Sequence, residues 1–132
     1  MHDLFLLFRS VYDPHTYVAW QYDRVRQIYQ RFAQAHPVAK TWLKWAKFEE
    51  HTGDLPRARL VYETAFQFLG EENADEKLFI EFAKFEERSK EFDRARGIYK
   101  FALDHVPKHL AQVRTLRHLY SLRPWQLGLF SL

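Results

Sequence analysis

Two pairs of adjacent carboxylates, Glu49-Glu50 and Glu86-Glu87, have the residue types that acid–base chemistry uses. One carboxyl group of such a pair can act as general acid while the other acts as general base. The pairs recur 37 residues apart in similar surroundings, however, and a catalytic site has no use for a tandem copy. No P-loop, Gly-x-Gly-x-x-Gly or Gly-x-Ser-x-Gly motif occurs. We therefore interpret the glutamates as structural, assign no catalytic residue and predict that the chain is not an enzyme.

Two histidines, His105 and His109, stand four residues apart, a spacing that presents two metal ligands when it lies on a helix. Pro107 lies between them and breaks the helix that would align them. No nearby glutamate completes a zinc-protease motif, and the chain has no cysteine to supply thiolate ligands. We predict no metal site, no cofactor and no small-molecule substrate.

The charge of the chain is unevenly distributed. It has 20 Lys and Arg residues against 17 Asp and Glu, a net charge of +3. Residues 105–132 contain no acidic side chain and four basic ones, Lys108, Arg114, Arg117 and Arg123. The first 104 residues are therefore nearly neutral, which is not the pattern of a nucleic-acid-binding domain. These four residues are the candidate RNA contacts, and RNA binding is kept as an alternative function.

Arginines interleaved with tryptophan and tyrosine also suit a stacking platform for single-stranded RNA. The same rings recur at helical spacing, which favours an inter-helix core. In that interpretation Arg26, Arg59 and Arg96 pair with Glu49 or Glu86, because a planar guanidinium holds a carboxylate with two hydrogen bonds.

Two sequence elements repeat in the same order. Residues 42–50, WLKWAKFEE, return as FIEFAKFEE at residues 79–87, which is 37 positions later. The element RARLVY that begins at Arg57 returns as RARGIY at Arg94, again 37 positions later. An earlier copy, RVRQIY, begins at Arg24, 33 positions before Arg57. Two ordered elements at such regular spacing identify an internal repeat.

Each element has the apolar spacing of an amphipathic helix. Three aspartates occupy places where an N-cap accepts bonds from free backbone amides: Asp23, Asp54 and Asp93. Pro37 and Pro107 follow helices of the second type and are predicted to end them. Gly53 marks the turn within one pair, whereas residues 87–91 must turn without a glycine.

The repeats predict an all-α fold in which antiparallel helix pairs stack as a short solenoid. One pair cannot bury both of its apolar faces, so neighbouring pairs must cover each other. Small residues would allow helices to approach closely at four positions: Ala46, Ala58, Ala83 and Ala95. No apolar run reaches the 18 or more residues that a membrane span needs, so no membrane partner is predicted.

These motifs resemble the HAT (half-a-TPR) repeat, and more specifically the crooked-neck-like pre-mRNA-splicing factors. The family pattern joins an aromatic-x-x-aromatic-Ala-x-x-Glu helix to an Ala-Arg-x-x-Tyr helix. The first copy here is formed by Trp42, Trp45, Ala46, Glu49, Ala58, Arg59 and Tyr62. The second copy is formed by Phe79, Phe82, Ala83, Glu86, Ala95, Arg96 and Tyr99. We take these 14 residues as the residues that define the repeat.

The resemblance covers residues 23–109, with the second helix of one repeat at 23–37 and full repeats at about 40–70 and 76–107. Residues 1–22 are a non-matching N-terminal segment, and residues 110–132 are a non-matching tail that is first basic and then apolar.

The resemblance implies a nuclear, non-catalytic scaffold that binds other proteins of the splicing machinery and meets RNA indirectly through the complex. Two alternatives remain open: a HAT scaffold of another RNA-processing complex, and a truncated copy without independent function.

Overall fold

A computed structural model of the chain describes residues 14–105 together with His118 and Tyr120. The chain divides into two units, Met1–His36 and Pro37–Leu132. The first unit contains helix α2 (Pro14–Ala35). The second contains α3 (Ala39–His51), α4 (Leu55–Asn73), α5 (Glu76–Arg88) and α6 (Phe92–His105). These described residues include no strand, so the predicted all-α class is confirmed.

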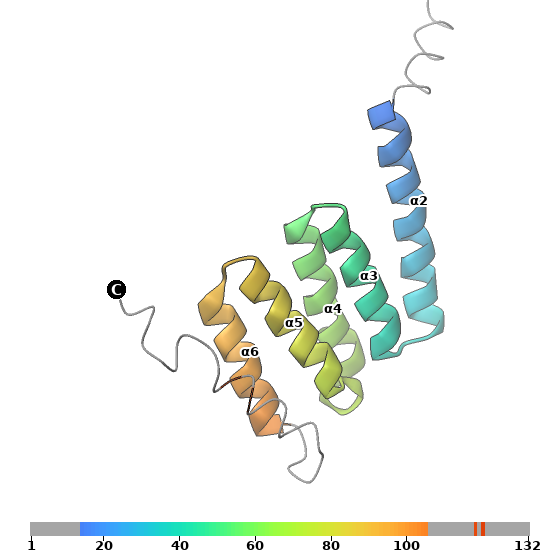
Figure 1. The fold of residues 1–132 in the computed structure, drawn as a ribbon. Coiled ribbons are helices and arrows are strands. Elements are labelled where there is room, and N and C mark those ends of the chain that lie inside the picture. Colours follow the sequence, from blue (N-terminus) through green and yellow to red (C-terminus); the bar gives the residue numbers. More distant parts are fainter. Residues whose placement is uncertain (1–13, 106–117, 119, 121–132) are drawn as a thin grey trace, which may run out of the picture. The chain divides into compact units, whose positions relative to one another are not determined.

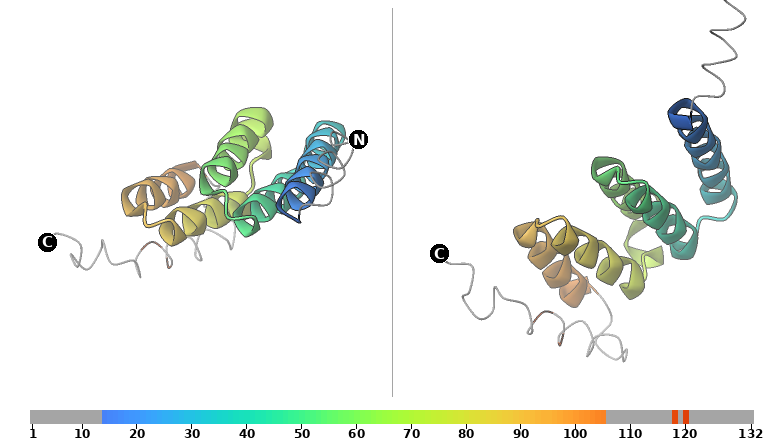
Figure 2. Two further views of the ribbon diagram at one scale, coloured as in Figure 1. Left: turned by 90° about the horizontal axis from the view of Figure 1, so that it is seen from above. Right: turned by 45° about the horizontal axis from the view of Figure 1, so that its top comes forward.

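The four helices of the second unit form two antiparallel pairs, α3 with α4 and α5 with α6 (Figure 1). Turns of three residues separate the helices within each pair, and such short connections favour antiparallel packing. The left view of Figure 2 shows α3 and α5 in one layer and α4 and α6 in a second layer. The predicted stacking of helix pairs is therefore present in this unit.

Side-chain caps define where two of the helices begin. The Asp54 carboxylate accepts a 3.1 Å bond from the Arg57 amide at the start of α4. Asp75 does the same for α5, accepting a 2.9 Å bond from the Leu78 amide. The cap prediction is confirmed for Asp54, whereas Asp75 was missed because it lies outside the repeated elements.

The other two predicted caps are wrong. Asp23 lies inside α2, which begins nine residues earlier at Pro14 and continues through this position. Asp93 lies in the first turn of α6, after the helix has begun at Phe92. At that place its charge still complements the positive end of the helix dipole. Pro37 follows the end of α2 as predicted, and Pro107 lies outside the described residues.

The two pairs turn at equivalent residues by different chemistry. Gly53 has φ of 87°, and Lys90, 37 positions later, has φ of 64°. Both values lie in the left-handed region, where glycine has no Cβ to clash. In the second turn the Glu91 amide bonds the Glu86 carbonyl at 2.8 Å, and the Lys90 amide bonds the Glu87 carbonyl at 3.0 Å. This is the Schellman pattern, and it makes the lysine adopt the strained conformation.

Replacing Lys90 with glycine is expected to stabilise the chain by about 1 kcal/mol, because glycine relieves the steric cost of the left-handed conformation. Gly53→Ala at the equivalent turn should destabilise it by a similar amount. Urea denaturation followed by circular dichroism measures both changes. An unchanged midpoint for Lys90→Gly would show that this turn is not left-handed in solution.

Candidate functional site

A buried carboxylate joins the two helix pairs. Glu86 on α5 is fully buried. The Arg59 guanidinium on α4 donates two hydrogen bonds to it, of 2.8 and 3.0 Å. The Arg94 guanidinium on α6 lies 3.4 Å from the same carboxylate. A buried charge is costly unless it is paired and hydrogen-bonded. The glutamate therefore holds one arginine from the preceding pair and one from its own pair.

Hydrogen bonding to carboxylates also shifts the ionisation of two arginines. The Glu86 carboxylate raises the pKa of Arg59 above its usual value, mainly through the hydrogen bonds. Glu50 raises the pKa of Arg88 in the same way, through contacts of 2.6 and 2.9 Å between α3 and α5. In both cases the hydrogen-bonded carboxylate stabilises the charged form of the guanidinium.

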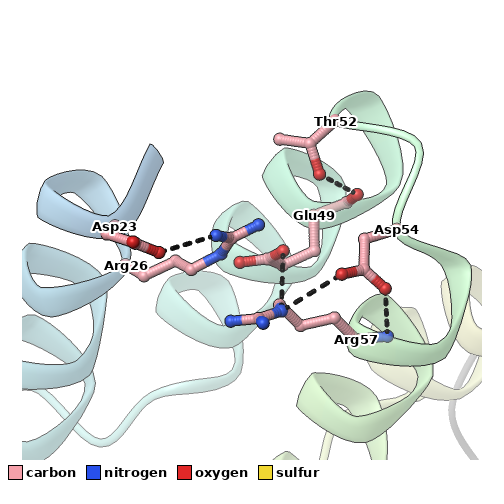
Figure 3. A network of polar contacts seen from close by, with 6 residues as sticks. All are labelled: Asp23, Arg26, Glu49, Thr52, Asp54 and Arg57. Atoms are coloured by element: carbon pink, nitrogen blue, oxygen red, sulfur yellow. Dashed lines mark hydrogen bonds and ion pairs between the residues drawn. The ribbon is translucent and has the colours of Figure 1, made fainter. Parts of the chain in front are cut away.

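The first pair contains a counterpart of this arrangement. Glu49 on α3 is fully buried, and the Arg57 guanidinium on α4 lies 4.0 Å from its carboxylate. Arg57 also donates a 3.2 Å hydrogen bond to Asp54. Figure 3 shows the Arg57 side chain directed between these two carboxylates. The hydroxyl of Thr52 donates to the Glu49 carbonyl at 2.7 Å and closes the end of α3.

The structure confirms one of the predicted ion pairs and overturns another. Arg59 pairs with Glu86, one of the two partners that the sequence left open. Arg96 instead contacts Asp93 at 3.2 Å on its own helix, where both side chains are exposed. In α2, Arg26 contacts Asp23 at 3.0 Å, which the close-up also shows (Figure 3).

The roles of Arg57 and Arg94 were missed. Both begin the repeated Arg-Ala-Arg element, and that recurrence was the available signal. Arg94 also contacts Glu63 on α4 at 2.7 Å, which adds a link between the second layer's two helices.

The repeated rings lie in the core, as their helical spacing predicts. Tyr62 and Tyr99 are both fully buried. The Tyr62 ring stacks on Phe82 of α5, with centroids 4.9 Å apart and planes 13° apart. It also meets Phe85 at 5.3 Å. These stacked contacts connect α4 with α5 beside the Arg59 ion pair, so the same interface is held by both charge and apolar packing.

Most residues of the repeat pattern are buried, and three are not. Trp45 and Arg59 are half-buried, and Arg96 is exposed. The ion-pair partners explain why Arg59 is less exposed than Arg96. Arg59 contacts a buried carboxylate, whereas Arg96 contacts an exposed one.

An apolar groove of about 510 Å³ opens between α4 and α6 and has α5 as its floor. It is lined by Phe66, Gln67, Gly70, Phe79, Phe82, Arg94, Gly97, Ile98 and Phe101. Gly97 takes the repeat position that Leu60 occupies in α4, and a Cβ at Gly97 would meet no atom within 4 Å. The missing side chain widens the groove. Grooves of this kind accept apolar side chains of a partner.

The part of the chain that the structure describes contains no group of three or more metal-ligating side chains. His105 directs Nδ1 to the Phe101 carbonyl at 2.8 Å and stacks on that ring, while His109 is not described. The four candidate RNA contacts, Lys108, Arg114, Arg117 and Arg123, also lie outside the described residues. RNA binding therefore stays a prediction. No helix found in residues 14–105 has the length and apolar character needed to cross a membrane.

Comparison with known protein families matches most of the helical region. Residues 21–51 match the HAT (Half-A-TPR) repeat, and residues 51–112 match the Pre-mRNA-splicing factor Syf1/CRNKL1 C-terminal HAT repeat. Both matches are HAT models, and together they span more than half of the chain. Residues 21–112 therefore belong to the HAT-repeat family.

Individual relatives point to the same group. The chain is 48% identical over 46 residues to Crooked neck-like protein 1 of Mus musculus and to that of Homo sapiens. The matched stretch is 34% of this chain but only 7% of the mouse protein and 5% of the human protein. The chain thus matches a small part of much longer relatives.

Arg59→Met is expected to destabilise the second unit by about 3 kcal/mol, because it leaves the buried Glu86 without its two best hydrogen bonds. The matched control is Arg96→Met, 37 positions later, which removes only an exposed ion pair and should cost less than about 0.5 kcal/mol. Thermal and urea denaturation compare the two. Equal losses of stability would mean that the buried pair does not hold the two helix pairs together.

Tyr62→Ala and Tyr99→Ala should each destabilise the chain by about 3 kcal/mol, as truncation of a core aromatic ring does. Tyr62→Phe should be neutral or slightly stabilising, because the buried hydroxyl has no hydrogen-bond partner among the described residues.

The same hydroxyl predicts a dependence on alkaline pH. Burial raises the pKa of Tyr62 above its ordinary value of 10.0. The unfolded chain therefore releases this proton first, and stability falls as the pH rises above about 10. In the Tyr62→Phe variant, the free energy of unfolding should therefore fall less steeply above pH 10 than it does in the parent chain. Identical curves for the two chains would show that the ring is solvated.

Proposed function

We propose that this chain is a protein-interaction scaffold acting in pre-mRNA splicing, in the nucleus, without catalytic activity. The observation that supports the assignment most directly is the match of residues 51–112 to the C-terminal HAT repeat of the Syf1/CRNKL1 splicing factors. The local 48% identity to Crooked neck-like protein 1 agrees with it. The repeat-defining residues then serve to shape a binding surface, and the partners are other proteins of the splicing machinery.

The chemistry of the described residues is consistent with a scaffold. The buried Glu49 and Glu86 are engaged by arginines, so they are not poised as acids and bases. The groove between α4 and α6 offers a mainly aromatic lining to an apolar segment of a splicing protein. A groove of this composition supplies binding energy by removing apolar surface from water.

Capture of proteins from nuclear extract by the tagged chain, after treatment with RNase, tests the function. We expect splicing proteins to be recovered and identified by mass spectrometry. Gly97→Trp should reduce their recovery at least tenfold, because the ring fills the groove without removing any existing contact. Leu60→Trp is the matched control: it places the same ring at the equivalent, exposed repeat position outside the groove and should retain them.

Circular dichroism must show that both variants are folded. Failure of the parent chain to capture any splicing protein would overturn the proposed function. Equal recovery by Gly97→Trp and Leu60→Trp would keep the function but exclude the groove as its contact surface.

A further inference from the structure

Helices α3 and α5 each carry one row of charged side chains on the side that faces solvent. The rows occupy equivalent repeat positions, spaced four, three and four residues apart, so each lies along one side of its helix. The α3 row consists of four exposed side chains, Lys40, Lys44, Lys47 and His51. The α5 row consists of Lys77, Glu81, Lys84 and Arg88. Apart from the histidine, these positions hold six basic side chains and a single carboxylate.

The two rows lie side by side on one face of the second unit. The Lys47 ammonium of the α3 row lies 3.9 Å from the Glu81 carboxylate of the α5 row. The Arg88 guanidinium donates two hydrogen bonds to Glu50 of α3, of 2.6 and 2.9 Å. Helices α3 and α5 form one layer, whereas α4 and α6 form the other (Figure 2). The charged face is therefore distinct from the groove, which opens between α4 and α6.

The α3 row departs from the charge pattern of an ordinary solvated helix. In the α5 row, Glu81 stands between Lys77 and Lys84, so that opposite charges alternate at favourable spacing. The equivalent position of α3 is Lys44, which places three lysines in succession, and like charges at this spacing destabilise a helix. Lys40 also lies in the first turn of α3, which has no acidic residue, and there a positive charge opposes the helix dipole. The fold gains no stability from this row.

The positive charge of the α3 row is largely uncompensated. Lys40 and Lys44 form no ion pair with any residue that the structure describes. Lys47 has one long contact, to Glu81, and its side chain is 54% exposed. Successive lysines of the row are separated by about 6 and about 4.5 Å along the helix axis. Those separations are shorter than the screening length at physiological ionic strength, so the fields of the three ammonium groups add.

The surroundings of the row favour carboxylates over nucleic acid as the binding partner. None of the exposed large apolar side chains found in the described residues lies on α3 or α5, so this face has no ring on which bases could stack. Arg88 is already engaged by Glu50, and lysine lacks the planar fork that holds a phosphate with two bonds. Glu50 and Glu81 also lie between the two rows, where they would repel a phosphate chain.

We propose that the α3 row docks an acidic helix of another protein. Carboxylates on one side of that helix, three and four residues apart, pair with Lys40, Lys44 and Lys47. The axial rise between such carboxylates is the same about 4.5 and about 6 Å that separates the lysines. The partner thus supplies the opposite charge that Glu81 supplies within the α5 row. This surface is a second contact site beyond the groove, and it does not depend on the splicing assignment.

The probe is a fluorescent alanine-based peptide of about 15 residues, long enough to form a helix, with glutamates at i, i+4, i+7 and i+11. It is titrated with the full chain at low ionic strength and followed by anisotropy. We expect saturable binding that weakens as NaCl is added. A peptide of the same composition, with its glutamates distributed around the helix, should bind about tenfold more weakly because fewer carboxylates reach the row.

Lys44→Glu is the decisive variant, because it introduces the residue type that α5 carries at the equivalent position. It should weaken peptide binding about tenfold, since an attraction becomes a repulsion. It should also raise the midpoint of thermal unfolding, because the new carboxylate pairs with Lys40 and Lys47. Lys100→Glu, the same charge reversal at an exposed position of α6, should leave binding unchanged. Lys44→Gln removes the charge alone and should weaken binding about threefold.

Four results would overturn the proposal. They are no saturable binding by the parent chain, equal binding of the two peptides, equal weakening by Lys44→Glu and Lys100→Glu, and preference for RNA. The last is tested with a fluorescent oligouridylate of similar length. Tighter binding of that RNA than of the peptide, lost in Lys44→Glu, would assign the row to nucleic acid.

Discussion

The second unit depends on a carboxylate that is taken completely out of water. Glu86 is stable in that position because Arg59 and Arg94 reach it from the helices on either side. A charge buried without those partners would cost several kcal/mol, on the order of the stability of a small domain. A shift of the α5/α6 pair on the α3/α4 pair that broke the two Arg59 hydrogen bonds would leave Glu86 with Arg94 alone.

Packing of rings complements that ion pair. Tyr62 stacks on Phe82 and Phe85 next to the Arg59 contact, so the interface between the pairs is apolar around a single charged centre. Four buried alanines let the helices come close enough for these rings to meet. Between α4 and α6, next to Phe79 of α5, the helices leave a groove. Gly97 widens this groove because it has no side chain to fill it. The stacked helix pairs and the groove thus arise from one packing arrangement.

Comparison of the repeats shows which of the equivalent residues are buried and which are exposed. On α4 and α6, the first arginine of the repeated element contacts a buried carboxylate of the same helix pair. The small or branched residues four and eight positions later pack against other residues of the chain. In α2 the same pattern is present, but its carboxylate partner and its apolar cover are not found among the described residues. The groove lies on the second unit, between α4 and α6, whereas the exposed Ile28 and Phe32 lie on α2 of the first unit.

The sequence by itself determined the helices of the second unit, their pairing and the burial of Tyr62 and Tyr99, because repeated apolar spacing is a local property of the chain. That Glu49 and Glu86 are fully buried was shown only by the tertiary structure. The sequence also indicated that Arg59 pairs with Glu49 or Glu86, and the structure selects Glu86. Only the tertiary structure decided that Arg94 rather than Arg96 shares that carboxylate, since both arginines belong to the same short element and only the rotation of α6 distinguishes them. It also decided that α2 continues past Asp23 and that Lys90 adopts a left-handed turn. The conformation of Lys90 follows from the Schellman hydrogen bonds at the end of α5, which outweigh the ordinary backbone preference of a lysine.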